Sequence, residues 1–173
     1  MVYLELTLRV LIDAARETVQ STASVLFIVA SAALFAWVLT IDRVPMLASE
    51  FLLGLTQNPI LLLLMVNAIL LVVGMVLESI AAILILAPIF TPALMAAGVD
   101  PIQLGVVVVL NLMIGLLTPP VGMSLYMVSI MARLPLQRVV AGAVPFLVPL
   151  VLALLVVTLV PEVSTWLPGV LIK

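Results

Sequence analysis

The 173-residue sequence contains no cysteine and no histidine, and only 8% of its residues are charged. These absences exclude disulfides and leave carboxylate, hydroxyl and backbone oxygens as the only metal ligands, so no transition-metal site is expected. They also remove the ordinary nucleophile–base pairs of enzymes, and no Gly-rich phosphate-binding loop is present. The net charge of −2 is too small and scattered for a nucleic-acid-binding protein. We therefore expect neither an enzyme nor a cofactor.

The sequence is instead rich in long runs of apolar residues. Hydrophobic residues make up 66% of the chain, and the mean hydropathy is +1.52. Several apolar runs reach the roughly 20 residues that are needed to span a lipid bilayer. Residues 1–20 show no secretory signal, because they carry Glu5, Asp13 and Glu17. The composition predicts an all-α polytopic membrane protein.

The first 57 residues divide into three expected helices. Residues 4–20 have an apolar and a charged face, which is typical of a helix lying in the membrane interface or of a connector packed against protein. Residues 22–41 are the first spanning candidate, and residues 45–56 form a short amphipathic segment opened by Pro45. At the other end of the chain, residues 139–160 are the last spanning candidate.

The chain is expected to finish near a membrane interface. Trp166 is an aromatic residue of the kind that collects there, and Pro168-Gly169 predicts a turn.

Residues 60–97 are almost entirely apolar and too long for one span. Asn58-Pro59 predicts an N-cap followed by a helix start, and the run suits two helices joined near residues 74–79. The join is either a tight loop at the far membrane surface or the buried tip of a re-entrant hairpin. Glu78 is the only ionisable residue in the run, and a carboxylate at membrane depth is functional by default. In a surface loop it would have no such role.

Residues 102–132 form an apolar run that cannot be helical throughout. Pro119 and Pro120 lack N–H groups, so the carbonyls of Gly115 and Leu116 lose their usual donors. The residue before each proline is also pushed out of the α region. Lipid offers no partners for the freed backbone groups, so such a break survives only where protein, water or an ion satisfies them.

Two half-helices would meet at this break, one ending near Leu117 and one restarting near Val121 or Gly122. A partly negative C-terminus then lies beside a partly positive N-terminus, a geometry used by ion-coupled transporters. The hydroxyl of Thr118 and the amide of Asn111 add oxygens. A hard cation such as sodium binds several oxygens of this kind, and potassium or a proton-linked water would fit the same groups.

The basic residues favour one topology. If residues 102–132 cross the membrane once, four of the six basic residues share one side, which is then predicted to be cytoplasmic; these are Arg9, Arg16, Arg133 and Arg138. If the break were instead the tip of a re-entrant hairpin, the last two would join Arg43 on the other side and the bias would vanish. We predict the single crossing.

Four stretches together resemble a known family: Gly74-Met-Val-Leu-Glu78, the run from Ile80 to Ile89, Gly98-Val-Asp100-Pro101, and Asn111-Leu-Met-Ile-Gly115-Leu-Leu-Thr118-Pro119-Pro120-Val121-Gly122. The chain resembles the C-terminal half of the large membrane (permease) subunit of tripartite ATP-independent periplasmic (TRAP) transporters. The resemblance runs over nearly all of the chain, and the combined motifs are specific, whereas the Thr-Pro-Pro element alone is not.

The resemblance implies a fold and a site. The fold is one half of an inverted-repeat, elevator-type transporter, with residues 58–97 as a re-entrant helical hairpin and residues 102–132 as a broken helix. Residues 1–57 then belong to the scaffold side and residues 58–173 to the transport side. The implied ion-binding positions are Gly74, Asn111, Gly115, Thr118 and Val121. The implied substrate-binding positions are Glu78, Ser79 and Gly122, with Pro119 and Pro120 forming the helix break.

The resemblance also implies sodium-driven uptake of organic acids across the bacterial inner membrane. The implied partners are a small membrane subunit, a periplasmic substrate-binding protein and the missing N-terminal half of the same subunit, without which this chain should not transport. Sodium is the coupling ion, and no other cofactor is implied. Two alternatives stay open: another ion-coupled dicarboxylate or anion symporter, and a non-transporting membrane scaffold fragment.

Overall fold

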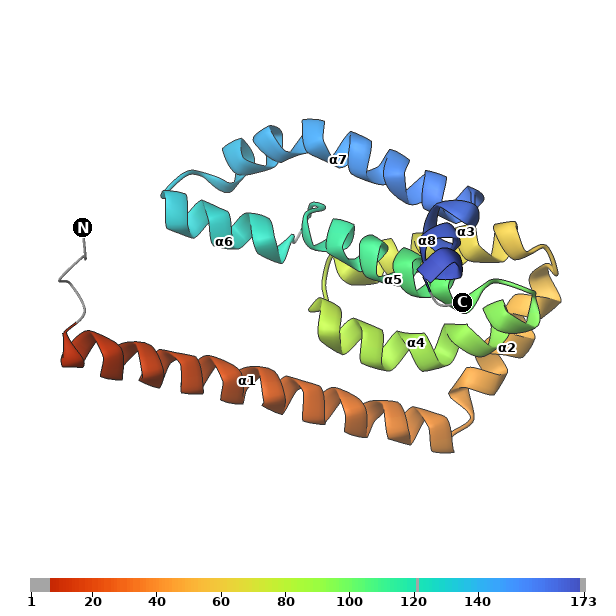
Figure 1. Ribbon diagram of the computed structural model, residues 1–173, viewed down its shortest axis with the longest axis horizontal. Helices are drawn as coiled ribbons and strands as arrows, with labels where there is room; N and C mark the ends of the chain where they lie inside the picture. Colours follow the sequence, from red (N-terminus) through yellow and green to blue (C-terminus); the bar gives the residue numbers. More distant parts are fainter. Residues whose placement is uncertain (1–6, 121, 172–173) are drawn as a thin grey trace.

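The computed structural model describes residues 7–120 and 122–171, which fold into eight α-helices (Figure 1). In chain order they are α1 (Leu8–Ile41), α2 (Val44–Leu55), α3 (Pro59–Gly74), α4 (Ser79–Ala96), α5 (Pro101–Leu116), α6 (Met123–Ala132), α7 (Leu136–Leu159) and α8 (Glu162–Leu171). The described part of the chain contains no β-strand. This agrees with the predicted all-α architecture.

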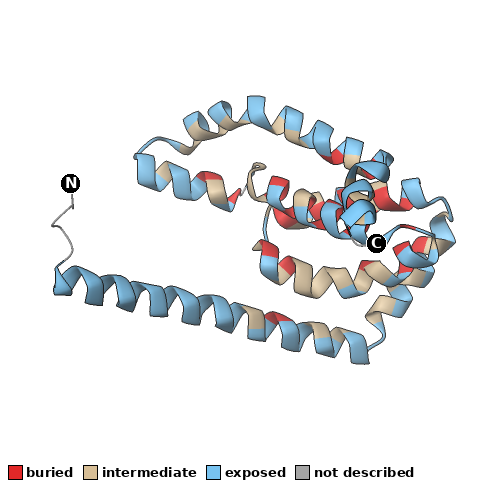
Figure 2. Cartoon of the chain, viewed as in Figure 1, coloured by how far each residue is buried: buried red, intermediate tan, exposed pale blue. Residues whose placement is uncertain are grey.

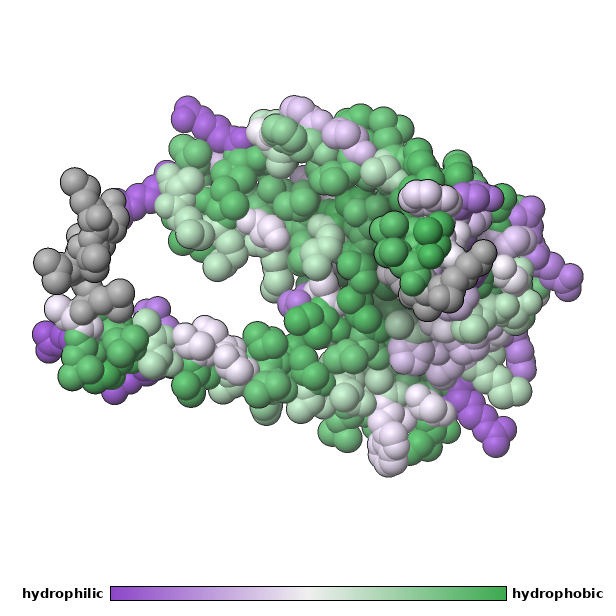
Figure 3. Space-filling model, in the orientation of Figure 1, coloured by the Kyte–Doolittle hydropathy of each residue, from purple (hydrophilic) through white to green (hydrophobic). Residues whose placement is uncertain are grey.

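Three of these helices, α1, α4 and α7, are long and apolar enough to cross a membrane. The outer surface of the molecule carries many large apolar side chains (Figure 3). Contiguous exposed apolar surface of this extent is unfavourable in water and is expected to face lipid or other protein. The helices therefore fit the predicted multi-pass membrane protein.

Helix α1 is continuous where two separate elements were predicted. It has 34 residues, so it is about 51 Å long at ~1.5 Å per residue, against ~30 Å for a hydrocarbon core. No glycine or proline interrupts it near residue 21, and the hydroxyl of Ser24 donates to the carbonyl of Gln20 without leaving the helix. The predicted boundary between residues 4–20 and residues 22–41 is therefore wrong.

The starts of α3 and α5 follow local signals, and that of α3 was predicted from Asn58-Pro59. The Oδ1 atom of Asn58 accepts from the N–H groups of Ile60 and Leu61 at 3.0 and 3.4 Å. The Oδ1 atom of Asp100 accepts likewise from the N–H groups at 102 and 103, at 2.8 and 3.3 Å. A proline follows each cap at the first helical position, where its missing N–H costs nothing.

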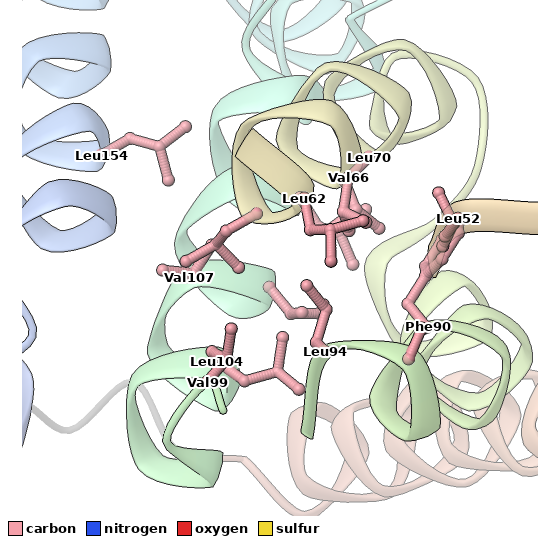
Figure 4. Packing of buried hydrophobic residues seen from close by; sticks show 14 of the residues in the cluster. Leu52, Leu62, Val66, Leu70, Phe90, Leu94, Val99, Leu104, Val107 and Leu154 are labelled. Carbon is pink, nitrogen blue, oxygen red and sulfur yellow. The ribbon is translucent and has the colours of Figure 1, made fainter. Parts of the chain in front are cut away.

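Helices α3 and α5 run side by side in the same direction (Figure 1). Helix α4 runs antiparallel to both and leads from the end of α3 back to the start of α5. The main hydrophobic core fills the space between these three helices, with single contributions from α2 and α7; Figure 4 labels Leu52, Leu62, Val66, Leu70, Phe90, Leu94, Val99, Leu104, Val107 and Leu154. Buried residues are correspondingly concentrated in α3–α5, whereas the first half of α1 and most of α6 are exposed (Figure 2).

The last helix differs from expectation. Residues 162–171 form α8, and Pro168 lies inside it, so the predicted Pro168-Gly169 turn is wrong. A proline removes only one hydrogen-bond donor from a helix, and this one lies in the final turn.

Candidate functional site

Two glycines bring α3 and α5 into contact at the end where both helices finish. A Cβ atom built on Gly115 would lie 2.7 Å from the backbone Cα and carbonyl carbon of Gly74. A Cβ atom on Gly74 would lie 3.3 Å from the Cα atoms of Gly115 and Leu112. Only a glycine fits at position 115 without moving a backbone, so the motif glycines of the two helices meet as a pair.

The helix stops at Leu116 and the next begins at Met123, which is where the two prolines predict an interruption. The carbonyl of Gly115 is not left free, as had been expected, because it accepts from the N–H of Thr118 at 2.9 Å. The hydroxyl of Thr118 donates to the carbonyl of Ile114 at 2.7 Å. The only proton of this hydroxyl is used in that hydrogen bond. Towards any other group the oxygen can therefore act only as an acceptor, through its lone pairs.

Beyond the break, Gly122 adopts a left-handed conformation (φ +45°) at the start of α6. A Cβ atom there would lie 3.2 Å from the carbonyl oxygen of Thr118, so these two site positions lie close together. Pro119 and Pro120 form the connection between them. The predicted ion ligand Val121 lies outside the described residues.

Helix α6 continues away from the break in the direction of α5 instead of doubling back (Figure 1). The α6–α7 turn, which contains Arg133, lies at the end of the molecule where α1 begins near Arg9. The α1–α2 turn, with Arg43, lies at the opposite end. This arrangement fits the single crossing that the basic residues predict.

Glu78 caps α4 at the turn that follows Gly74. Its Oε2 atom accepts from the N–H groups of Ile80 and Ala81 at 2.9 and 3.1 Å. The side chain is half-buried, and it borders a small cavity with Val25 and Ile28 of α1. These α1 residues belong to the apolar run 22–41. The turn between α3 and α4 therefore lies beside the apolar part of α1, and not beyond the end of that helix.

Ser79, next to Glu78, is buried, and its hydroxyl has no hydrogen-bond partner among the described residues. A buried hydroxyl without a partner is costly, which makes this oxygen a candidate contact for a ligand.

Asn111 faces α3 and is completely buried. Its side-chain Nδ2 donates at 2.9 Å to both the backbone oxygen and the Oδ1 atom of Asn67. Its own Oδ1 has no hydrogen-bond partner in the described part of the chain. Asn111 thus lies one helical turn before the glycine pair, on the α3–α5 contact.

The contact extends into a polar network that the sequence did not predict. The Nδ2 atom of Asn67 donates to the hydroxyl of Thr158 at 2.8 Å, and that hydroxyl donates to the carbonyl of Leu154 at 2.7 Å. The Nε2 atom of Gln103 donates to the carbonyls of Val157 and Thr158, both at 3.0 Å. Asn67 is one of the few polar residues in the apolar run 60–97, but nothing in the sequence pairs it with a residue 91 positions away.

The helix ends at this site carry partial charges of both signs: the ends of α3 and α5 favour a cation, whereas the start of α6 at Gly122, which has no side-chain cap, favours an anion. The last turns of α3 and α5 both contribute the partial negative charge of a helix C-terminus. The partial positive charge at the start of α4 is covered by the carboxylate of Glu78. The described residues contain no cluster of three or more acidic side chains that could hold a metal ion.

These features define an all-helical protein, over the described residues, with three helices long and apolar enough to span a membrane. Over residues 1–163 the chain matches the family described as the tripartite ATP-independent periplasmic transporter, DctM component. The chain belongs to this family, as its motifs predict.

Individual relatives agree. A sialic acid TRAP transporter large permease protein from Vibrio cholerae is 40% identical over 168 residues, which are 97% of this chain and 39% of the relative. A C4-dicarboxylate TRAP transporter large permease protein from Pseudomonas aeruginosa is 43% identical over 153 residues, or 88% and 36%. An isethionate TRAP transporter permease protein from Oleidesulfovibrio alaskensis is 35% identical over 168 residues, or 97% and 26%.

The chain thus spans between 26% and 39% of the length of these three relatives. The chain therefore corresponds to a part of such a subunit, as expected.

Proposed function

We propose that this chain is part of a TRAP transporter large permease subunit and contributes one side of a sodium-coupled carrier site for organic acids. The observation that carries the proposal is the family match over residues 1–163. The chain spans only part of its relatives, so we expect no transport by it alone.

The finish of α3 and α5 supports the sodium site. Two helix C-termini converge there, and the hydroxyl oxygen of Thr118 keeps free lone pairs because its proton is donated to Ile114. Sodium, as a hard cation, favours several oxygens of this kind. The proposed ion-binding positions are Gly74, Asn111, Gly115, Thr118 and Val121.

The turn between α3 and α4 is proposed to be the tip of a re-entrant hairpin. Helix α3 has 16 residues, or about 24 Å, which is shorter than a hydrocarbon core of ~30 Å. Glu78 also borders a cavity with Val25 and Ile28 of α1. Both observations support a tip at membrane depth. An elevator movement of this hairpin against α1 follows from the family resemblance and is part of the proposal.

The substrate is proposed to contact Glu78, Ser79 and Gly122. The carboxylate of Glu78 already covers the start of α4, so the helix dipole there has little attraction left for an anion. We therefore expect bound sodium, with the buried hydroxyl of Ser79 and the uncapped start of α6 at Gly122, to attract the organic acid. This makes anion binding dependent on sodium, which is what coupled transport requires.

The relatives are named for sialic acid, C4-dicarboxylates and isethionate, all of which are organic anions. We propose an organic anion as the substrate of the complete transporter, with a small membrane subunit and a periplasmic binding protein as partners. The bacterial inner membrane is the proposed location.

The test is uptake by the complete subunit with both partners in proteoliposomes. Succinate, sialic acid and isethionate are offered in turn, with an inward gradient of sodium or of potassium at equal ionic strength. We expect uptake of one of these anions with sodium and at least a tenfold lower rate with potassium. Equal rates with the two cations would reject sodium coupling, and uptake of none of the anions would reject the proposed substrates.

A further inference from the structure

We infer that Thr158 and Asn67 are positioning residues that set the affinity of the sodium site, although they do not touch the ion. They do so through a directional chain of hydrogen bonds that ends on Asn111 and holds α3 and α5 in one register. The inference rests on the proposed function, and it adds two residues to which no site role has been given.

The direction of the chain is fixed at Thr158. Its hydroxyl proton is committed to the carbonyl of Leu154, so towards Asn67 this oxygen only accepts. The Asn67 amide must therefore turn its NH₂ group to Thr158 and its oxygen to Asn111. Asn111 in turn must present its NH₂ group to Asn67. The backbone oxygen of Asn67, which can only accept, orients the Asn111 amide in the same sense, so the hydroxyl at one end of the chain and the carbonyl at the other favour the same orientation of both amides.

The two amides in turn fix the register of α3 against α5. Asn111 binds both the backbone and the side-chain oxygen of Asn67. A slip of one residue is ~1.5 Å along a helix and would break both bonds. The Gly74–Gly115 contact lies beyond these bonds, towards the end of the two helices. It tolerates no such slip, because a residue with a side chain would replace Gly115, and a Cβ atom at that place would lie 2.7 Å from backbone atoms of Gly74. The chain therefore determines how the two helix ends that form the ion site face each other.

Burial supports a specifying role over a merely cohesive one. Asn67, Thr158 and Asn111 are 7%, 1% and 0% exposed. Polar side-chain pairs between membrane helices contribute little stability on average, so cohesion alone gives little reason for this network. Inside membranes, helices associate largely by close packing, and polar pairs select a geometry. The unpaired Oδ1 of Asn111 is an unfavourable feature that the network retains.

The test is a sodium titration of thermal unfolding of the purified complete subunit with its small membrane partner, at constant total sodium plus potassium. Binding to the folded state raises the melting temperature, so the sodium midpoint reports the site and the potassium-only value reports the fold. For Thr158→Val we expect the sodium midpoint to rise about fivefold, the consequence of one lost buried hydrogen bond. Thr158→Ser keeps the hydroxyl and should stay within about twofold of the wild type.

Thr40→Val is the matched control. The hydroxyl of Thr40 also donates to a carbonyl one turn earlier, but it is exposed and accepts from no second side chain in the described residues. Its sodium midpoint should not change. The double variant Asn67→Leu/Thr158→Val is included because it removes both partners of their shared hydrogen bond and so leaves neither facing an apolar group, while Asn111 keeps its bond to the backbone oxygen of residue 67. It should show the raised midpoint even if the single variant does not fold.

A purely structural role would lower the potassium-only melting temperature of Thr158→Val and leave its sodium midpoint unchanged, which overturns the inference. A wild-type midpoint in the double variant overturns it as well. If the wild type itself shows no sodium-specific shift, the proposed sodium site fails. If the sodium midpoint of Thr118→Val differs from that of the wild type but the midpoint of Thr158→Val equals it, only this inference fails.

Discussion

The two ends of the α3–α5 pair are built differently. At the start, Asn58 and Asp100 cap the first N–H groups with side-chain oxygens, and prolines follow at the first helical positions. At the finish, two glycine backbones touch and the hydroxyl of Thr118 completes the last turn of α5. The start is closed by short-range side-chain signals, which stabilise a fold. The finish brings two helix backbones together around small residues, and the buried oxygens without a partner near it, among the described residues, are those of the Ser79 hydroxyl and the Asn111 amide.

The largest effect is expected at the glycine pair. Gly115→Ala places a methyl group 2.7 Å from the backbone of Gly74, so the helices must separate and the site must open. We expect a stability loss of about 1–3 kcal/mol and a loss of most uptake, measured by thermal unfolding and by transport in proteoliposomes.

Two other glycines are the controls. Gly74→Ala meets its neighbours at 3.3 Å and should be milder, and Gly105→Ala meets nothing within 4 Å. The latter should be neutral or more stable by about 0.5–1 kcal/mol, because alanine is the better helix former. Equal effects at positions 115 and 105 would show that the two helices do not depend on this contact.

The next largest effect is expected at Glu78. Glu78→Gln keeps the size of the side chain and an acceptor for the α4 cap but removes the charge. We expect uptake to fall about tenfold with folding largely intact, since a weaker cap costs at most ~1 kcal/mol. Glu78→Asp keeps the charge, and Asp is a good N-cap, so it should be milder. Glu50→Gln, on the exposed surface of α2, is the control. If Glu78→Gln lowers uptake no more than Glu50→Gln does, Glu78 does not belong to the site.

A smaller, more specific effect is expected at Thr118. Thr118→Val removes one oxygen and nearly preserves volume, so we expect the half-saturating sodium concentration to rise about fivefold, with expression unchanged. Thr165→Val removes an α8 hydroxyl that donates to the carbonyl of Pro161, just before the helix, and should leave sodium dependence unaltered. If both variants match the wild type, the break contributes no ion ligand through this side chain.

The smallest effect belongs to the start of the pair. Asp100→Ala removes a cap with two hydrogen bonds and should cost about 1 kcal/mol of stability. The sodium dependence of uptake should stay as in the wild type. A change in sodium affinity would mean that the two ends are not separate in function.

The same contrast explains what the sequence predicted. Helix starts at Pro59 and Pro101 and the interruption after Leu116 depend on residues close together in the chain, so they were predictable. The pairing of Asn67 with Thr158 depends on how α7 folds back, and no local signal encodes it. The boundary expected inside α1 rested on a change of polarity, but a helix ends only where backbone bonding is interrupted.

The site shows the same division. The motif residues Gly74 and Gly115 were predicted to belong together, and they meet. That the carbonyl of Gly115 finds a donor in the N–H of Thr118 was not predicted, because it depends on the exact path of the chain before Pro119. Sequence identifies which residues gather, and three-dimensional geometry decides which atoms remain free.

The central claim is that the α3–α4 turn lies at membrane depth beside a sodium site, whereas the turn before α5 does not. The most direct test is cysteine labelling of the complete subunit in nanodiscs with a membrane-impermeant reagent, after removal of any other cysteines. Leu77→Cys reports the first turn without altering a proposed ligand, and Asp100→Cys reports the second. We predict slow labelling at 77, at a rate that sodium changes and potassium does not, and fast labelling at 100 that neither ion affects. Fast, sodium-independent labelling at both positions would contradict the claim.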